Sequence, residues 1–300
     1  MQRSRTRSRF IRTPFVSVQS SLNVAKLVLL YKSLAACLLI LATASTASAA
    51  FEIGPETSRR IVLSPRSLSF AHIEGLWYNP AWISRLRNFG GCAGYSPGMF
   101  GLRELSSASL GATMPTGFGT AGIALVTSGF DAYREVSLGA VWSTTVTDQF
   151  SAGGRLNLHR LDISNYGGAT AWSLDAGVTG EMIPQVTLSA YARNIFGNSI
   201  GRSSEPLPRE FSLGLVWSPG GLQIGVGADS DVRFPVSLRC ALEYAVLDAF
   251  TLNGGVASGP SEFTLGGTAR IGAFEVRYSA LVHPELGVTH FFGLSFGVDR

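Results

Sequence analysis

The chain has 300 residues, 46% of them hydrophobic, and a formal net charge of +4. The first 49 residues hold 7 basic residues and no acidic one, which leaves 17 basic against 20 acidic residues in the remainder, a net charge of −3. Because the positive charge lies in a leader and not on a patch of the fold, a nucleic-acid partner is not expected.

Residues 1–49 have the pattern of a secretory signal peptide. They start with basic residues, continue with an apolar run from Ser33 to Ala42, and end on the small residues Ala47-Ser48-Ala49. Small residues at these positions suit signal peptidase, so cleavage is expected after Ala49 and export through the secretory pathway follows. The alternative is a membrane anchor helix, for which the apolar run is short.

Residues 50–90 are the least regular part of the chain. Pro80 and a mixed polar pattern argue against a central strand here. A segment that carries Trp77, Tyr78 and Trp82 just before a barrel is expected to fold back into the lumen as a plug. The alternative is a loose periplasmic tail with a short helix.

Residues 91–300 alternate apolar and polar side chains, as in Val236, Leu238, Cys240 and Leu242 with polar or small residues between them. A period of two gives each strand one apolar and one polar face. The pattern predicts an all-β fold, a transmembrane antiparallel barrel of about fourteen strands. The strands are expected to start near Gly91, Arg103, Phe118, Tyr133, Phe150, Thr170, Gln185, Arg209, Gly221, Pro235, Ala249, Glu262, Ala273 and Gly287.

The connections between these strands alternate in length. Those after the second, fourth, sixth, eighth, tenth and twelfth strands are tight, as at Ile183-Pro184 and Pro219-Gly220. The others are mostly longer and include Ser128 to Ala132, Leu161 to Ala169 and Asn194 to Pro208. Outer-membrane barrels have short periplasmic turns and longer outer loops, so the alternation indicates the outer membrane of a Gram-negative-type cell.

Charged side chains occur at the polar positions of the predicted strands. On the lipid face each would cost about 2–4 kcal/mol near the midplane, so they are assigned to the lumen. Two interpretations remain open: they brace a narrow lumen, or they form a polar lining that guides a ligand. The set is Glu135, Arg155, Asp175, Arg193, Arg239, Glu243, Glu262, Arg270, Glu275 and Arg277.

No catalytic or metal site is expected. Gly293-Leu-Ser295-Phe-Gly297 matches a nucleophile pattern, but that motif needs a sharp strand-to-helix turn and here lies within an alternating strand. No serine and acid converge in register with His159, His283 or His290. The remaining cysteines, Cys92 and Cys240, lack a metal-type spacing, so neither an enzyme nor a cofactor is predicted.

The chain resembles the FadL superfamily of outer-membrane barrels and, within it, the smaller PorV/PorQ-type proteins. Asn79-Pro80-Ala81 matches the Asn-Pro-Ala of the family's amino-terminal hatch. Further matches run from Leu174 to Val178, Val186 to Gly197, Leu207 to Gly214, Arg239 to Tyr244, Tyr278 to Ala280, Glu285 to His290, and Gly293 to Phe296. The resemblance implies a fourteen-stranded barrel with a hatch that contains Asn79, Pro80 and Ala81, together with Trp77, Tyr78 and Trp82.

The resemblance leaves two functions open. Some members are passive channels for hydrophobic molecules, and others act in type IX secretion by carrying proteins at the cell surface. The lack of long outer loops favours a surface shuttle or scaffold that binds secreted proteins at its rim. The aromatic hatch favours a channel for small hydrophobic molecules, which is the first expectation. Either function places the protein in the lipid bilayer of the outer membrane.

Overall fold

The computed structural model describes residue 51 and residues 73–297, except residues 203, 232–234 and 260. The predicted signal peptide and most of the amino-terminal part of the hatch lie outside the described residues. No helix among the described residues is long and apolar enough to cross a membrane.

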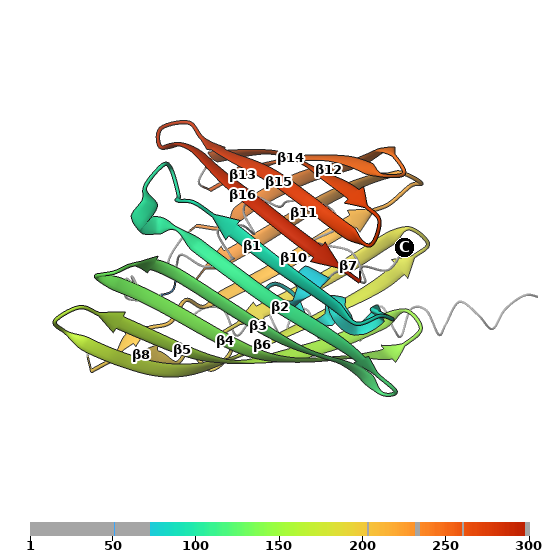
Figure 1. Ribbon diagram of the computed structural model, residues 1–300. Helices are drawn as coiled ribbons and strands as arrows, with labels where there is room; N and C mark the ends of the chain where they lie inside the picture. Colours follow the sequence, from blue (N-terminus) through green and yellow to red (C-terminus); the bar gives the residue numbers. More distant parts are fainter. Residues whose placement is uncertain (1–50, 52–72, 203, 232–234, 260, 298–300) are drawn as a thin grey trace, which may run out of the picture. The chain divides into compact units, whose positions relative to one another are not determined.

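Fourteen strands form a closed antiparallel barrel (Figure 1). Each strand pairs with its neighbour in sequence, and β1 closes the barrel against β16 through the pairs Gly91–Phe296 to Tyr95–Phe292. The strands are β1 (Gly90–Ser96), β2 (Ser107–Thr116), β3 (Gly119–Phe130), β4 (Tyr133–Thr147), β5 (Phe150–Ile163), β6 (Gly167–Ile183), β7 (Val186–Arg193), β10 (Glu210–Trp217), β11 (Leu222–Asp231), β12 (Ser237–Leu247), β13 (Phe250–Ser258), β14 (Ser261–Ile271), β15 (Phe274–His283) and β16 (Gly287–Phe296).

The fourteen predicted strands are therefore confirmed, and thirteen of them start within three residues of the predicted position. The second strand was predicted to start near Arg103, which is wrong because residues Arg103–Leu105 form the 3-10 helix η4 and β2 begins at Ser107. The segment between β7 and β10 also contains a small hairpin that the sequence did not indicate, made of β8 (Ser199–Ile200) and β9 (Glu205–Pro206).

The connections that the sequence predicts to be tight all lie at one end of the barrel, here called the turn end. They comprise residues 117–118, 148–149, 184–185, 218–221, 248–249 and 272–273. Three ladders shift register beside these turns, at Thr145/Thr147, Glu181/Ile183 and Ala245/Leu247. Such bulges add local twist where a strand bends into its turn.

At the opposite end, the loop end, three predicted loops are shorter than expected. β5 and β6 stay paired up to Ile163–Gly167, β3 and β4 up to Phe130–Tyr133, and β13 and β14 up to Ser258–Ser261. The predicted loops at 161–169, 128–132 and 257–261 are wrong because backbone pairing continues past the stretch in which apolar and polar residues alternate regularly.

The two faces of the wall differ as the sequence predicts. In β12, Leu238 and Leu242 are exposed on the outside, whereas Arg239 and Glu243 are buried on the inside. The same alternation runs through β14, β15 and β16. A closed barrel with an apolar exterior and polar interior positions is the form that crosses a bilayer, because it leaves no backbone group unpaired in lipid.

Leu265 provides a test of this lipid face. It lies in the middle of β14 and is 70% exposed, so Leu265→Arg is expected to cost about 2–4 kcal/mol of folding free energy. The cost is measured by urea-dependent folding into lipid vesicles. Leu286→Arg, in the loop-end connection 284–286, is the control and is expected to cost little. Equal costs at the two sites would contradict the assigned lipid face.

Candidate functional site

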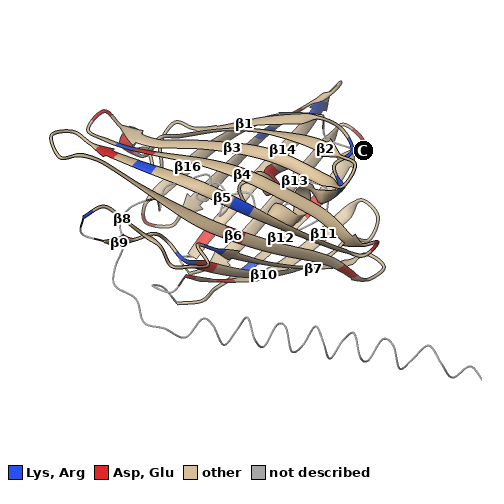
Figure 2. Ribbon diagram, turned by 90° about the horizontal axis from the view of Figure 1, so that it is seen from below, with Lys and Arg blue, Asp and Glu red and all other residues tan. Residues whose placement is uncertain are grey.

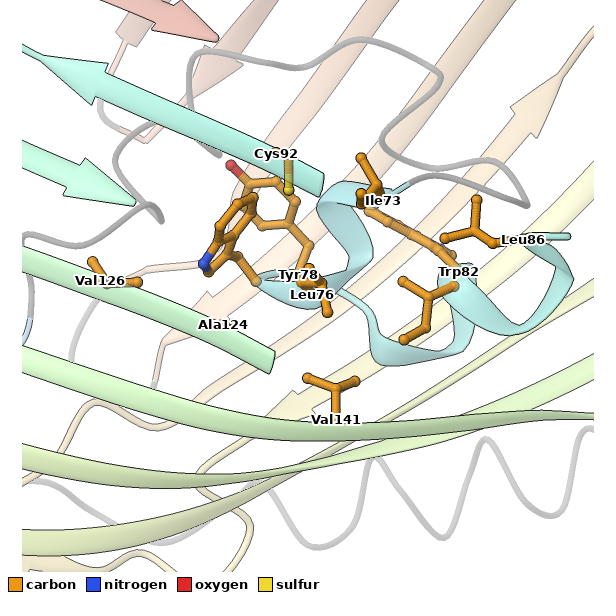
Figure 3. Packing of buried hydrophobic residues seen from close by; sticks show 11 residues of the cluster. Ile73, Leu76, Tyr78, Trp82, Leu86, Cys92, Ala124, Val126 and Val141 are labelled. Carbon is orange, nitrogen blue, oxygen red and sulfur yellow. The ribbon is translucent and has the colours of Figure 1, made fainter. Parts of the chain in front are cut away.

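The described part of the hatch, residues 73–89, leads into β1 and packs against the inside of the barrel. It contains two short 3-10 helices, η2 (Ile73–Leu76) and η3 (Pro80–Arg85). η3 packs on β3, β4, β5 and β6, and η2 packs on β1, β2 and β3. Figure 3 shows the cluster that their apolar side chains form with residues of the strands; it consists of Ile73, Leu76, Trp77, Tyr78, Trp82, Ile83, Leu86, Cys92, Ala124, Val126 and Val141.

Asn79 begins η3 and also fixes it to the wall. Its Oδ1 accepts a hydrogen bond from the Ala81 backbone N–H at 3.0 Å, which caps the helix, and Pro80 takes the first helical position. Its Nδ2 donates to the carbonyl oxygens of Val178 in β6 and Ala190 in β7, at 3.1 and 3.2 Å. A side-chain amide is suited to this position because it carries an acceptor and two donors together.

Two glycines of the wall make room for this turn of the hatch. A Cβ atom on Gly153 of β5 would lie 2.7 Å from the backbone carbonyl carbon of Pro80. A Cβ atom on Gly177 of β6 would lie 1.9 Å from Oδ1 of Asn79. The hatch therefore approaches the sheet, with its backbone at Gly153 and with the Asn79 side chain at Gly177, more closely than any other residue type at these positions would permit.

Polar contacts tie the hatch to other parts of the barrel. Arg155 of β5 donates from Nη1 to the Leu76 carbonyl at 2.8 Å. Glu74 pairs with Arg277 of β15. Arg85 donates to the carbonyl of Asp148, in the turn between β4 and β5. The Glu74–Arg277 pair joins η2 to a strand 203 residues further along the chain.

A cavity remains on the side of the hatch that faces β10, β11 and β12. Tyr78 and Trp82 form one wall, and small residues of the strands form the other. The volume of the cavity, measured as the space open to the centres of water molecules, is about 50 Å³. A cavity of this size has room for only a few water molecules. The lining is mostly apolar. Its strand side includes Gly214, Gly225, Gly227 and Ala241, and also the charged residues Asp229 and Arg239.

Charged residues occupy few positions on the barrel wall (Figure 2). A buried polar network centres on Asp175 of β6, which is fully buried. Its Oδ2 accepts from Nε and Nη2 of Arg155, at 2.9 and 2.6 Å, and from Asn157 at 2.8 Å. Tyr191 also donates to Oδ2, at 3.3 Å, and the Asn194 backbone N–H donates to Oδ1 at 2.8 Å. The network joins β5, β6 and β7 behind the hatch.

The other predicted lumen residues lie in separate groups. Arg239 pairs with Asp229 of β11 at 2.5 Å, and Arg270 pairs with Glu275 at 2.5 Å. Nine of the ten predicted lumen residues are buried, namely Glu135, Arg155, Asp175, Arg193, Arg239, Glu243, Glu262, Glu275 and Arg277, and Arg270 is partly exposed.

The histidines and the Gly-x-Ser-x-Gly serine do not meet. Ser295 lies within β16, and His290 is exposed on the outside, where Nδ1 contacts the Tyr278 hydroxyl at 2.9 Å. His159 lies between the hydroxyls of Ser137 and Ser173, at 2.8 and 2.9 Å, a grouping that the sequence did not indicate. Among the described residues, no group of three or more His, Cys, Asp or Glu is placed to hold a metal ion.

Sequence reasoning missed several residues of this site. No sequence motif singles out Glu74, Asn157 or Tyr191, because the residues that they contact lie on other strands or far along the chain. Gly153 and Gly177 did carry a signal, because a glycine within a strand often marks close approach of another backbone. The two sit at the polar, inward positions of β5 and β6, where such an approach could have been predicted.

No family model matches the sequence, and no curated protein matches it. Solved structures do match. The toluene transporter TbuX of Ralstonia pickettii aligns with a TM-score of 0.57 and 11% identity, over 80% of this chain and 97% of that chain. A FadL homologue of Pseudomonas aeruginosa gives 0.54 and 12%, over 78% and 96%. CymD, a monoaromatic hydrocarbon channel, gives 0.55 and 11%, over 76% and 94%.

Similarity at this level of identity establishes the fold. The chain shares the fold of these structures, and its own closed barrel has fourteen strands, as the resemblance to the FadL superfamily implied. The finer resemblance to PorV/PorQ-type proteins stays a prediction.

Proposed function

We propose that this protein is a passive outer-membrane channel for small hydrophobic molecules and that the hatch gates it. The observation that carries the proposal is the position of the hatch, which Asn79 holds by side-chain hydrogen bonds between an apolar cavity and the wall. The cavity is too small for an aromatic hydrocarbon when the hatch is in place. A ligand therefore passes only after the hatch moves.

The attachment of the hatch suits a reversible movement. It includes the buried apolar cluster, the two hydrogen bonds of Asn79, single hydrogen bonds from Arg155 to Leu76, from Arg85 to Asp148 and from Trp82 to Ser189, and the Glu74–Arg277 ion pair. Among the described residues, no disulfide fixes the hatch to the wall, because Cys92 and Cys240 are free thiols. The neighbouring structures named as toluene and monoaromatic hydrocarbon channels support the substrate class.

The charged lumen residues are proposed to brace the barrel and not to guide the ligand. Arg155 and Asp175 bond to each other and to Leu76, and Arg239 bonds to Asp229 on the next strand. A hydrophobic molecule gains nothing from contact with such groups, whereas a wall that surrounds a mobile hatch needs internal support. The ligand path is therefore assigned to the aromatic and glycine surfaces around the cavity.

Asn79→Asp tests the gate with a change of almost no volume. The carboxylate still caps η3 but presents oxygen to the carbonyls of Val178 and Ala190, so both wall contacts become unfavourable. The substitution is expected to destabilise the closed state relative to the open state by about 1–3 kcal/mol. The fraction of open channels then rises by roughly 5–150-fold, until all channels are open. The measurement is uptake of the apolar dye N-phenyl-1-naphthylamine by a Gram-negative host that produces the variant.

The controls are an unrelated barrel, the parent protein and Asn165→Asp, a change in the exposed loop-end turn 164–166. The parent should take up dye faster than the unrelated barrel, and Asn79→Asp faster still, with Asn165→Asp equal to the parent. Equal uptake by Asn79→Asp and the parent would count against a gating hatch. Equal uptake by the parent and the unrelated barrel would count against the channel and favour the rim-binding alternative.

A further inference from the structure

Phe51 is held in a built site inside the barrel, near the loop end. Its ring packs against Ile200 and Leu207, with Leu161, Ala169 and Ala171 around them, and meets the ring of His159 at 4.9 Å. Its backbone nitrogen donates to Oε1 of Glu135 at 2.6 Å. Its carbonyl oxygen lies 3.5 Å from Nη2 of Arg193. The ring, the nitrogen and the carbonyl of one residue are thus each recognised separately.

Glu135 itself is 5% exposed. Among the described residues, its carboxylate accepts hydrogen bonds from the Phe51 nitrogen, the Tyr133 hydroxyl at 2.6 Å and the Ser128 hydroxyl at 3.2 Å. The two hydroxyls are neutral donors. Arg193 lies close enough to attract the carboxylate electrostatically, but the hydrogen bond from its Nη2 goes to the Phe51 carbonyl. A buried carboxylate is costly to desolvate unless a positive charge is paired with it. The nitrogen of Phe51 is the group in direct contact that could carry this charge.

The sequence before Phe51 allows its nitrogen to become charged. Ser48-Ala49-Ala50 places small residues at positions −3 and −1 of a cut after Ala50, as signal peptidase requires. Hydrolysis of the Ala50–Phe51 amide adds water across the C–N bond, leaving a carboxylate on Ala50 and an amine on Phe51. The amine takes up a proton near neutral pH to become an ammonium ion.

We propose that signal peptidase cuts between Ala50 and Phe51 and that the new ammonium group of Phe51 binds Glu135 inside the barrel. The cut then lies one residue beyond the position expected from Ala47-Ser48-Ala49. The ring of Phe51, its ammonium group and its carbonyl together anchor the start of the mature chain to β4, β7 and the β8–β9 hairpin. This anchor is independent of transport, since Glu135 and Phe51 do not line the cavity beside Tyr78 and Trp82.

The composition of the chain makes the proposal easy to test. Its only lysines are Lys26 and Lys32, both in the leader. The processed protein therefore has a single amine, the one at its amino terminus. An amine-reactive acetylating reagent reports on that group alone, and the intact mass identifies the first residue.

The first measurement is the intact mass of the protein extracted from the outer membrane. The proposal predicts a chain that starts at Phe51, and a chain that starts at Ala50 or elsewhere overturns it. The second is the rate of acetylation in the folded, detergent-solubilised protein. The folded parent should react at least about tenfold more slowly than the urea-unfolded protein, because the site must open before the amine can react. Equal rates would also overturn the proposal.

Glu135→Gln separates ion pairing from simple burial. It should bring the acetylation rate of the folded protein close to the unfolded rate, whereas Glu285→Gln, at the exposed loop end, should leave the parent's protection intact. Full protection in a folded Glu135→Gln variant would show that the carboxylate is not the partner of the amine. If Glu135→Gln does not fold, the mass and the protection of the parent still decide the proposal.

Discussion

Gly153→Ala is expected to open the channel, while Gly154→Ala is expected to leave it closed. The two glycines are adjacent in β5 and point to opposite faces. A Cβ atom at 153 meets the Pro80 carbonyl carbon at 2.7 Å and the Ala81 nitrogen at 2.8 Å, both backbone atoms of the hatch. A Cβ atom at 154 meets only the Asp175 carbonyl oxygen, at an ordinary 3.7 Å. The same methyl group is thus a clash on one side and harmless on the other.

The clash acts on the closed state alone, because it disappears once η3 moves away from β5. Overpacking of this kind costs about 1–3 kcal/mol, which corresponds to a roughly 5–150-fold rise in the open fraction. The barrel should survive, since Gly153 keeps its pairs with Ser143 and Gly177. Dye uptake and heat-modifiable gel migration are measured together. Parent-like uptake by a folded Gly153→Ala barrel would contradict the proposed gate.

Asp175→Ala is expected to be the most destabilising single change in the wall. It removes the carboxylate that accepts from Arg155, Asn157, Tyr191 and the Asn194 backbone, and the buried Arg155 guanidinium loses the carboxylate with which it forms an ion pair. Breaking a buried pair from one side typically costs about 3–5 kcal/mol. The loss is measured by urea-dependent unfolding in lipid vesicles.

Asp162→Ala is the matched control, because Asp162 also pairs with an arginine of β5. The Arg160–Asp162 distance is 2.7 Å, but the two side chains are 60% and 42% exposed. Exposed pairs of this kind contribute about 0–1 kcal/mol. A loss for Asp175→Ala as small as that for Asp162→Ala would show that the network around Asp175 does not brace the barrel.

The wall of the barrel could be predicted from sequence because its determinants are local. Alternation in stretches such as Ser237–Leu247 reports the two faces directly, and a tight turn such as 248–249 reports where a strand ends. Prediction failed at the loop end, where β5 and β6 extend past the stretch of regular alternation and where Arg103 starts a 3-10 helix. There, strand length depends on backbone pairing and not on contact with lipid.

The candidate site was only partly predictable, for a different reason. Asn79 could be singled out by its motif, but its partners are carbonyl oxygens of Val178 and Ala190, which have no side-chain signature. The Glu74–Arg277 pair depends on how the hatch crosses the lumen, which no local pattern encodes. Contacts made across the lumen become visible only when the closed barrel places distant strands around one segment.

The most direct test of the hatch as a gate is dye uptake by a variant whose hatch can be locked. Asn79→Cys and Gly177→Cys, combined with Cys92→Ala and Cys240→Ala, place one thiol on the hatch and one on β6. A Cβ atom on Gly177 would lie 2.7 Å from Cγ of Asn79, so the two Cβ atoms are near the roughly 3.5–4.5 Å separation of a disulfide. The oxidised variant should take up little dye, and a reductant should raise its uptake above that of the parent. Equal uptake before and after reduction, with the disulfide verified by mass, would contradict the account.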